Sequence, residues 1–366
     1  MKTKIRNLSL AAALSAVSLS SSALDNNYKV WGNENISFGR GIATAIGGGH
    51  INLKAPDCII HDGLNIPFSA GSIKLSVRSI KTSSELSRSI TDKIGVTAKA
   101  ANKKVETFSA SFNHGEVKNS VSKSLTSVGE VKVTKDFGFS HLKNPRMNQS
   151  LLNVLNQEDP YSLYKLCGDS FAYGYRRTIE LSAYIVCDAN SRTSKNQLDR
   201  SFSGFGIYEG VNIGGSASRK IDELTTHATE GCRVLFNSEG GSGNIDLSSP
   251  EQFIKSSVNY AVNAGIDDAW VSEIEALSFR GLIAEDFQSL LGSQTLEFTR
   301  AQEVSEPLRL AARNIIEDYL LSETEEAKDA MSLIFSTLDR CIAEPWNFED
   351  SCVAESGEDI DWWDVL

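Results

Sequence analysis

The chain has 366 residues, of which 41% are apolar and 23% are charged. This composition is typical of a globular protein and excludes a disordered or collagen-like chain. The formal net charge of -11 has the wrong sign for a nucleic-acid binder, which presents a net basic face, so we expect no nucleic-acid partner.

The first 23 residues have the pattern of a secretory signal peptide. Lys2, Lys4 and Arg6 precede an apolar run over residues 8–19, and small residues lead to Ala23. The run is shorter than the roughly 20 residues that a helix needs to cross a bilayer, which makes a membrane anchor the less favoured interpretation. We therefore expect a protein exported to the periplasm or the extracellular space.

Six cysteines follow the predicted signal peptide, and an even number in an exported chain favours disulfides over metal sites. Cys341 and Cys352 are close in sequence and separated by a loop that contains a proline, so we expect them to pair. The sequence leaves the pairing of the other four open.

The region before residue 240 alternates apolar and polar residues as strands do. The pattern predicts strands over 72–80, 130–134, 179–187 and 232–236, and the third of these is the most apolar. A short helix is expected near residues 148–156. Glycine, serine, threonine and β-branched residues are frequent throughout this region, as they are in sheet domains.

After residue 250 the apolar period becomes helical and the charge turns acidic. Ser249 and Pro250 form a helix start, and further helices are expected over 307–321 and from residue 322 onward. Residues 251–366 carry 7 Lys+Arg against 25 Asp+Glu, a shift that suggests a boundary. We predict a sheet domain over 24–250, a helical region over 251–343 and an acidic tail with tryptophans over 344–366.

One stretch carries a family resemblance. A short helical run is followed by Cys167, Gly168, Asp169, Ser170 and Phe171, then by the apolar strand, and segments rich in serine and glycine lie on both sides. This order resembles the membrane-attack-complex/perforin superfamily, whose core has a Tyr-Gly-Thr-His-Phe/Tyr motif at that point. Gly168 and the aromatic Phe171 match the motif, while Cys167, Asp169 and Ser170 depart from it.

The resemblance implies an α+β fold: a bent, twisted, mainly antiparallel central sheet with flanking helical clusters, to which the acidic C-terminal helical region is added. It also implies that the flanking segments, about 98–142 and 202–229, refold into membrane β-hairpins. A membrane strand needs about 9 to 11 alternating residues; the first segment meets this criterion and the second does so ambiguously. The candidate lipid-facing residues are Phe108, Ala110, Phe112, Val131, Val133, Phe205 and Ile207.

Two such hairpins cannot close a sheet alone, so the hypothesis requires a ring of subunits. We expect a secreted pore-forming protein whose partners are a lipid membrane and further copies of itself, with a surface glycan or a protein as a possible receptor. The alternatives are a non-lytic binding or adhesion module with the same fold and, third, a secreted toxin enzyme.

Motifs for catalysis are weak. The glycine-rich residues 39–49 lack the Lys-Ser/Thr of a P-loop, Ser170 lacks a G-x-S-x-G elbow, and the five histidines have no metal-ligand spacing. Arg176 and Arg177, with two nearby tyrosines, suggest a strand end or a contact for an anionic group. We expect no enzyme activity, no cofactor and no metal.

Overall fold

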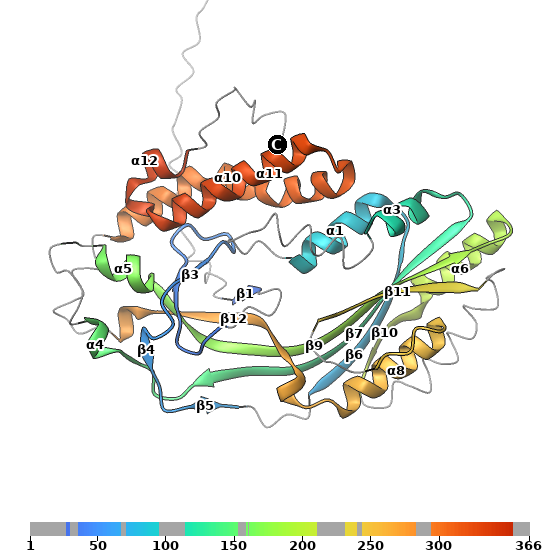
Figure 1. Cartoon of the computed structure of the whole chain (residues 1–366), viewed down its shortest axis with the longest axis horizontal. Coiled ribbons are helices and arrows are strands. Elements are labelled where there is room, and N and C mark those ends of the chain that lie inside the picture. The colour runs from blue at the N-terminus through green and yellow to red at the C-terminus, as the bar shows by residue number, and fades with distance from the viewer. Residues whose placement is uncertain are drawn as a thin grey trace, which may run out of the picture.

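A ten-stranded sheet forms the centre of the protein, with helices on both faces (Figure 1). The computed structural model describes residues 27–29, 36–66, 71–94, 114–152, 159, 161–210, 231–239, 244–282 and 294–353. The strands of this sheet and of a separate two-stranded one are β1 (Asn27–Lys29), β2 (Gly41–Ala43), β3 (Asn52–Leu53), β4 (Ile59–Ile60), β5 (Leu64–Asn65), β6 (Ser72–Ile80), β7 (Thr126–Leu142), β8 (Arg146–Met147), β9 (Ser170–Asp188), β10 (Gly206–Glu209), β11 (Cys232–Glu239) and β12 (Trp270–Ser278).

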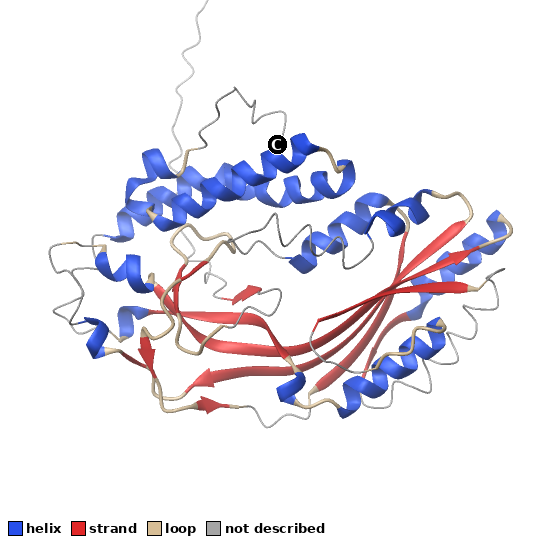
Figure 2. Ribbon diagram, in the orientation of Figure 1, coloured by secondary structure: helices blue, strands red, loops and turns tan. Residues whose placement is uncertain are grey.

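The described helices follow β6 along the chain, and they cover the sheet from two sides (Figure 2). The α-helices are α1 (Ser83–Ile94), α3 (His114–Ser122), α4 (Gln149–Leu152), α5 (Ser162–Cys167), α6 (Arg192–Phe205), α8 (Pro250–Asn263), α10 (Gln294–Ser322), α11 (Glu325–Ala343) and α12 (Phe348–Ser351), and the 3-10 helices are η1 (Ile266–Asp268), η2 (Phe279–Gly281) and η3 (Pro345–Asn347).

The middle of the sheet consists of β6, β7, β9 and β12 in that order, each antiparallel to its neighbour. β12 pairs with the first half of β9 and β11 with the second half, so β12 and β11 follow one another along the same side of β9. Two short strands extend the sheet at its sides, β1 beside β12 and β10 beside β6. The α+β fold expected from the sequence is therefore confirmed.

Irregular pairing bends the sheet. The register of β7 against β9 shifts between Asp136 and Phe139, and β12 shifts twice against β9. Gly138 lies within the first shift and has a φ of 77°, a left-handed conformation that glycine adopts without strain. Bulges of this kind bend a strand and increase its twist, and the long strands curve accordingly in Figure 2.

The two faces of the sheet differ in polarity because side chains alternate along each strand. Val131 and Val133 of β7 are fully buried on one face, where α6 and α8 cover them. Lys132 and Thr134 point to the other face, which is an open polar groove. Further along, this second face becomes apolar, and α1, α3, α10 and α11 cover it.

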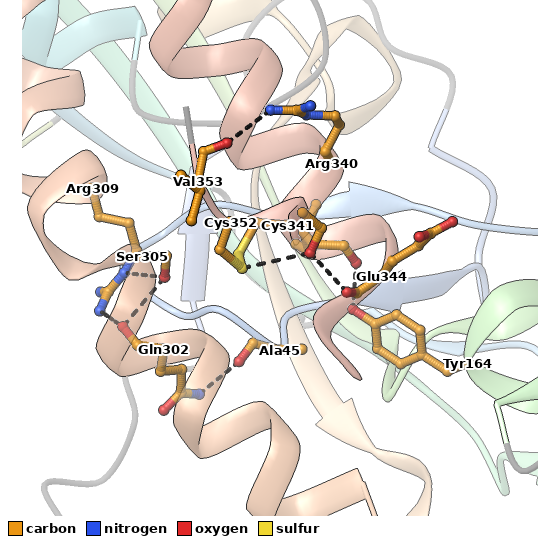
Figure 3. The surroundings of a disulfide bond; sticks show 12 residues. Ala45, Tyr164, Gln302, Ser305, Arg309, Arg340, Cys341, Glu344, Cys352 and Val353 are labelled. Atoms are coloured by element: carbon orange, nitrogen blue, oxygen red, sulfur yellow. Dashed lines mark hydrogen bonds between the residues drawn. A yellow bond between two sulfur atoms is a disulfide. The ribbon is translucent and has the colours of Figure 1, made fainter. Parts of the chain in front are cut away.

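The helices at the C-terminal end pack on the rest of the protein through one buried core, and a disulfide joins α11 to the residue that follows α12. Cys341 of α11 is bonded to Cys352, which confirms the pairing expected from their spacing. Figure 3 shows the surroundings of this bond, where the Tyr164 hydroxyl donates to the Ile342 carbonyl oxygen at 2.6 Å. In α10, the Gln302 amide donates to the Ala45 carbonyl oxygen at 2.8 Å. These contacts hold α11 against α5 and α10 against the segment that follows β2.

Two of the expected boundaries differ from the structure. β12 lies inside the region expected to be helical, 251–343, and completes the sheet, so residue 250 does not separate a sheet domain from a helical one. The helix expected to begin at Pro307 begins at Gln294, and Pro307 lies inside α10. Of the tail over 344–366, residues 344–353 form η3 and α12, and the rest lies outside the described residues.

Candidate functional site at one end of the sheet

Four strand ends form a row at one end of the sheet. Ile80 of β6 pairs with Val128 of β7, Val128 pairs with Val186 of β9, and Val186 pairs with Arg233 of β11. Residues 81–125 connect β6 to β7, and residues 189–231 connect β9 to β11. Two long connections therefore leave the same end of the sheet, and each joins two neighbouring antiparallel strands.

The first connection begins with α1, which packs under α10. Leu86 and Ile90 are fully buried in the core that α10 and α11 share. On the outside of α1, Asp92 forms an ion pair with Arg313 of α10. This helix is held by a few apolar side chains and by exposed ion pairs, which each contribute at most about 1 kcal/mol.

The same connection ends with α3, which contacts the turn between α10 and α11. The Lys118 ammonium donates to the Leu321 carbonyl oxygen at 2.6 Å and to a Glu323 carboxylate oxygen at 3.3 Å. His114 is 3% exposed, and its Nδ1 lies 3.4 Å from the same Glu323 oxygen. Burial lowers the pKa of His114, with Lys118 acting in the same direction and the Glu323 carboxylate opposing both. Protonation of this buried imidazole is therefore unfavourable in the folded protein.

The second connection begins with α6 on the opposite face of the sheet. Its N-terminus is capped by Ser191, whose hydroxyl accepts from the Ser194 N–H. Leu198, Phe202 and Phe205 are buried against the sheet with α8. The Phe202 ring lies so close to Gly129 of β7 that a Cβ at that glycine would be 2.2 Å from the ring. A side chain at position 129 would push α6 away.

From α6 the chain turns into β10, which pairs with β6 over four residues. The Gly210 N–H donates to the Ile73 carbonyl oxygen at 3.0 Å, so these two residues form a hydrogen-bonded pair. Such pairs alternate with non-hydrogen-bonded pairs along an antiparallel ladder. Ile207 and Ser76, three positions away, are therefore directly opposed without hydrogen bonds between them. Ile207 is 62% exposed. The Lys74 ammonium lies 3.6 Å from the Glu209 carboxylate, and both side chains are largely in solvent. β10 is thus a short strand with little buried area.

A disulfide lies at the base of the second connection. Cys187, near the end of β9, is bonded to Cys232, the first residue of β11, and the two are directly opposed in the sheet. Residues 188–231 form the loop that this bond closes. The bond fixes the two strands at the base of the connection.

The segment at the position of the family motif joins α5 to β9. Cys167 is bonded to Cys58, and Phe171 is fully buried in β9. A Cβ at Gly168, whose φ is 80°, would be 2.1 Å from the Ile42 carbonyl oxygen, so only glycine fits this crossing. The Asp169 carboxylate accepts from the Thr44 N–H at 2.8 Å and from its hydroxyl at 3.0 Å. Desolvation raises the pKa of Asp169 to about 6, against the effect of these hydrogen bonds.

The candidate hairpin residues are distributed over different environments. Val131 and Val133 lie within the central strand β7, not in a connection. Phe205 ends helix α6 where a strand pattern was expected, and Ile207 lies in β10. The remaining candidates lie outside the described residues: Phe108, Ala110 and Phe112.

The polar groove on the open face contains Arg176, for which the sequence suggested a strand end or an anion contact, together with partners that the sequence did not single out. Arg176 is not at a strand end; it lies in the middle of β9, where its guanidinium pairs with Asp136 of β7 and, at 3.2 Å, with Glu273 of β12. Hydrogen bonds to Asp136 raise the pKa of Arg176. Desolvation acts to raise the pKa of Asp136, but the hydrogen bonds from Arg176 and the Gly138 N–H, with the charge of Arg176, lower it overall. Arg176, Asp136 and Glu273 come from distant parts of the chain, so no local sequence pattern could have grouped them.

Over the described ranges, no three His, Cys, Asp or Glu side chains cluster as metal ligands would. Within the same ranges, no helix combines the length and the apolar character needed to cross a membrane. The three disulfides are consistent with an exported protein, because such bonds persist in oxidising compartments. The predicted signal peptide lies outside the described residues.

Comparison with known proteins does not assign a family. No protein-family model matches the chain, and no curated protein matches it. Among solved structures, the chain is similar to GNIP1Aa from Chromobacterium piscinae, with 12% identity and a TM-score of 0.30 over 74% of this chain and 55% of that one. It is also similar to stonustoxin, with 9% identity and a TM-score of 0.30 over 85% of this chain and 46% of that one. The chain spans about half the length of each, and these TM-scores are too low to carry a conclusion about function.

Proposed function

We propose that the protein is an exported, non-enzymatic, membrane-active protein whose copies assemble into a ring and insert β-hairpins from the two connections. The observation that carries the proposal is the row of four strand ends, from which both connections leave between neighbouring antiparallel strands. A connection in that position can extend its two strands continuously as a hairpin. The resemblance of the sequence to the membrane-attack-complex/perforin superfamily agrees with this arrangement.

The free energy that holds α6 of the second connection on the sheet is small enough for membrane insertion to offset it. Releasing α6 exposes three buried side chains, Leu198, Phe202 and Phe205, which costs about 5–9 kcal/mol at about 1.5–3 kcal/mol each. New strand pairing and contact with lipid can offset a cost of this size. Unpaired backbone groups are too unfavourable in lipid for a lone hairpin, so insertion requires neighbouring subunits on both sides.

The disulfide at position 167 supports the non-enzymatic part of the proposal. Cys167, at the position of the family motif, is bonded to Cys58 and so has no free thiol to act as a nucleophile. Asp169 beside it is engaged by Thr44 through both carboxylate oxygens. The disulfide and these hydrogen bonds therefore give both side chains a role in the folded structure that requires no catalytic function.

A disulfide lock tests the proposal. The opposed pair Ser76 and Ile207 is suited to an engineered bond, Ser76→Cys with Ile207→Cys, because directly opposed residues without hydrogen bonds have close Cβ atoms. All six native cysteines are paired, so no free thiol competes. The measurement is dye release from phosphatidylcholine vesicles, with and without cholesterol or phosphatidylserine.

The wild type is expected to release dye, the locked protein to release none, and mild reduction to restore release. Each single cysteine variant is the matched control and should behave as the wild type does under both conditions. Dye release by the locked, oxidised protein would show that the second connection stays in place during release. No release by wild type from any of these vesicles would contradict the proposal as a whole.

A further inference from the structure

The polar face of the sheet forms a groove of about 650 Å³, a volume within the usual range for a small-ligand site. Its floor is made by β6, β7 and β9, and α1, β10 and β12 border it. The groove therefore adjoins α1 and β10, which belong to the two connections, and its floor reaches Arg78 and Glu130, close to the row of strand ends.

Charges in the groove alternate in sign and pair with one another across the strands. Arg78 pairs with Glu130 at 2.5 Å, and Lys132 pairs with Glu180 at 2.5 Å. Arg176 lies between Asp136 and Glu273, as described above. Glu130 is only 5% exposed and also accepts from the Ser89 hydroxyl at 2.9 Å. These side chains hold each other in place, so a ligand would meet donors and acceptors that are already oriented.

One strong donor in the groove has no such partner. Trp270, the first residue of β12, lines the groove, and its buried indole N–H donates to no acceptor among the described residues. An unsatisfied buried donor costs about 1–3 kcal/mol. The N–H is covered in the structure, so a ligand oxygen removes this cost only after the indole ring shifts toward the groove. Its ring also provides an apolar surface beside the polar floor. Ser76, Thr134 and Ser272 add hydroxyl groups that can donate or accept.

We propose that this groove binds a neutral oligosaccharide. Each sugar hydroxyl both donates and accepts, so a row of hydroxyls suits a surface on which carboxylates and cations alternate. The five carboxylates and four basic groups of the groove nearly cancel, so neither a polyanion nor a polycation gains a strong net attraction there. An apolar ligand would leave paired charges desolvated without compensation. The indole ring can cover the apolar face of one sugar ring while its N–H donates to an oxygen.

The test uses the full-length exported protein in solution, without membranes, so that its outcome is independent of pore formation. The probes are maltoheptaose, cellohexaose, chitohexaose, xylohexaose and laminarihexaose, with heparin and oligochitosan as charged comparisons. Binding is measured by isothermal titration calorimetry and by tryptophan fluorescence. At least one neutral oligosaccharide is expected to bind, and the two charged polymers are expected to bind more weakly than it does.

Two substitutions at Trp270 separate the contributions of its ring and its N–H. Trp270→Ala is expected to weaken binding at least tenfold. Trp270→Phe, which keeps an aromatic ring, should weaken it about three- to tenfold, as the loss of one hydrogen bond does. Lys132→Gln inside the groove should also weaken binding, while Arg146→Gln, whose ion pair with Asp62 lies outside the groove, is the matched control and should not. Thermal unfolding of each variant establishes that it is folded.

Three outcomes would overturn the proposal. The first is that none of the five neutral oligosaccharides binds. The second is that heparin or oligochitosan binds more tightly than all of them. The third is that a bound neutral oligosaccharide loses no affinity in folded Trp270→Phe and Lys132→Gln variants.

Discussion

The buried carboxyl of Asp169 makes a quantitative prediction about stability and pH. Its pKa of about 6 in the folded protein lies above the ordinary value of 3.8. Between those two pH values the folded state holds a proton that the unfolded chain releases, so the free energy of unfolding falls as the pH rises through this window. Asp169→Asn removes the titration and leaves an amide that can still accept from the Thr44 N–H.

The expected magnitude follows from the shift. About two pKa units correspond to about 3 kcal/mol, and this is an upper limit because the residue keeps some exposure to solvent. Relative to the Asn variant, the wild type should therefore lose up to about 3 kcal/mol of stability between pH 4 and pH 7.5. Other titrating groups are the same in both proteins and cancel in this difference.

Urea unfolding of both proteins at pH 4, 5, 6 and 7.5, with the disulfides intact, measures the difference directly. A steady loss for the wild type relative to the variant, complete above about pH 6.5, is the expected result. A difference that stays constant over the whole range would show that the Asp169 carboxyl is not desolvated in the folded protein, and the environment described for the motif segment would be wrong.

Two further predictions concern the attachment of the connections. The valine side chain of Gly129→Val would displace Phe202 of α6. The free energy of unfolding should fall by about 1–3 kcal/mol, as overpacking causes, and α6 should become sensitive to protease. An unchanged Tm would contradict this packing. His114 has a lowered pKa in the folded protein, so stability should be lost as the pH falls below about 6.5, where the unfolded chain binds more protons. His114→Asn should reduce that loss, measured by urea unfolding at pH 5 and 7.5, and equal losses in both proteins would refute the assignment.

The sequence predicted elements whose signal is local. The alternation over residues 72–80 corresponds to β6, and Ser249 and Pro250 mark the start of α8, where the Ser249 hydroxyl accepts from the Gln252 N–H. The pairing of Cys341 with Cys352 was accessible because only a short loop separates them. In each case residues near one another in the chain determine the outcome.

Features that depend on distant residues were missed. β12 alternates as a strand does, but it is surrounded by helical, acidic sequence, and its pairing with the distant strands β9 and β1 defines it. Phe205 was read as part of a strand because its neighbours alternate, whereas burial under α8 and against the sheet favours the helix. The charged groove likewise joins β6, β7, β9 and β12, whose order in space the sequence does not state.

The movement of the second connection into lipid is the central claim, and labelling at two adjacent positions tests it most directly. Ile207→Cys and Tyr208→Cys each place one thiol in a protein that otherwise has none free, and an environment-sensitive fluorophore on it reports polarity. Adjacent residues of a membrane strand face opposite sides. On vesicles that release dye, the label at 207 should shift to the blue. The label at 208, a position that is partly buried in the soluble form, should then report water. Dye release with both labels in water would contradict the account.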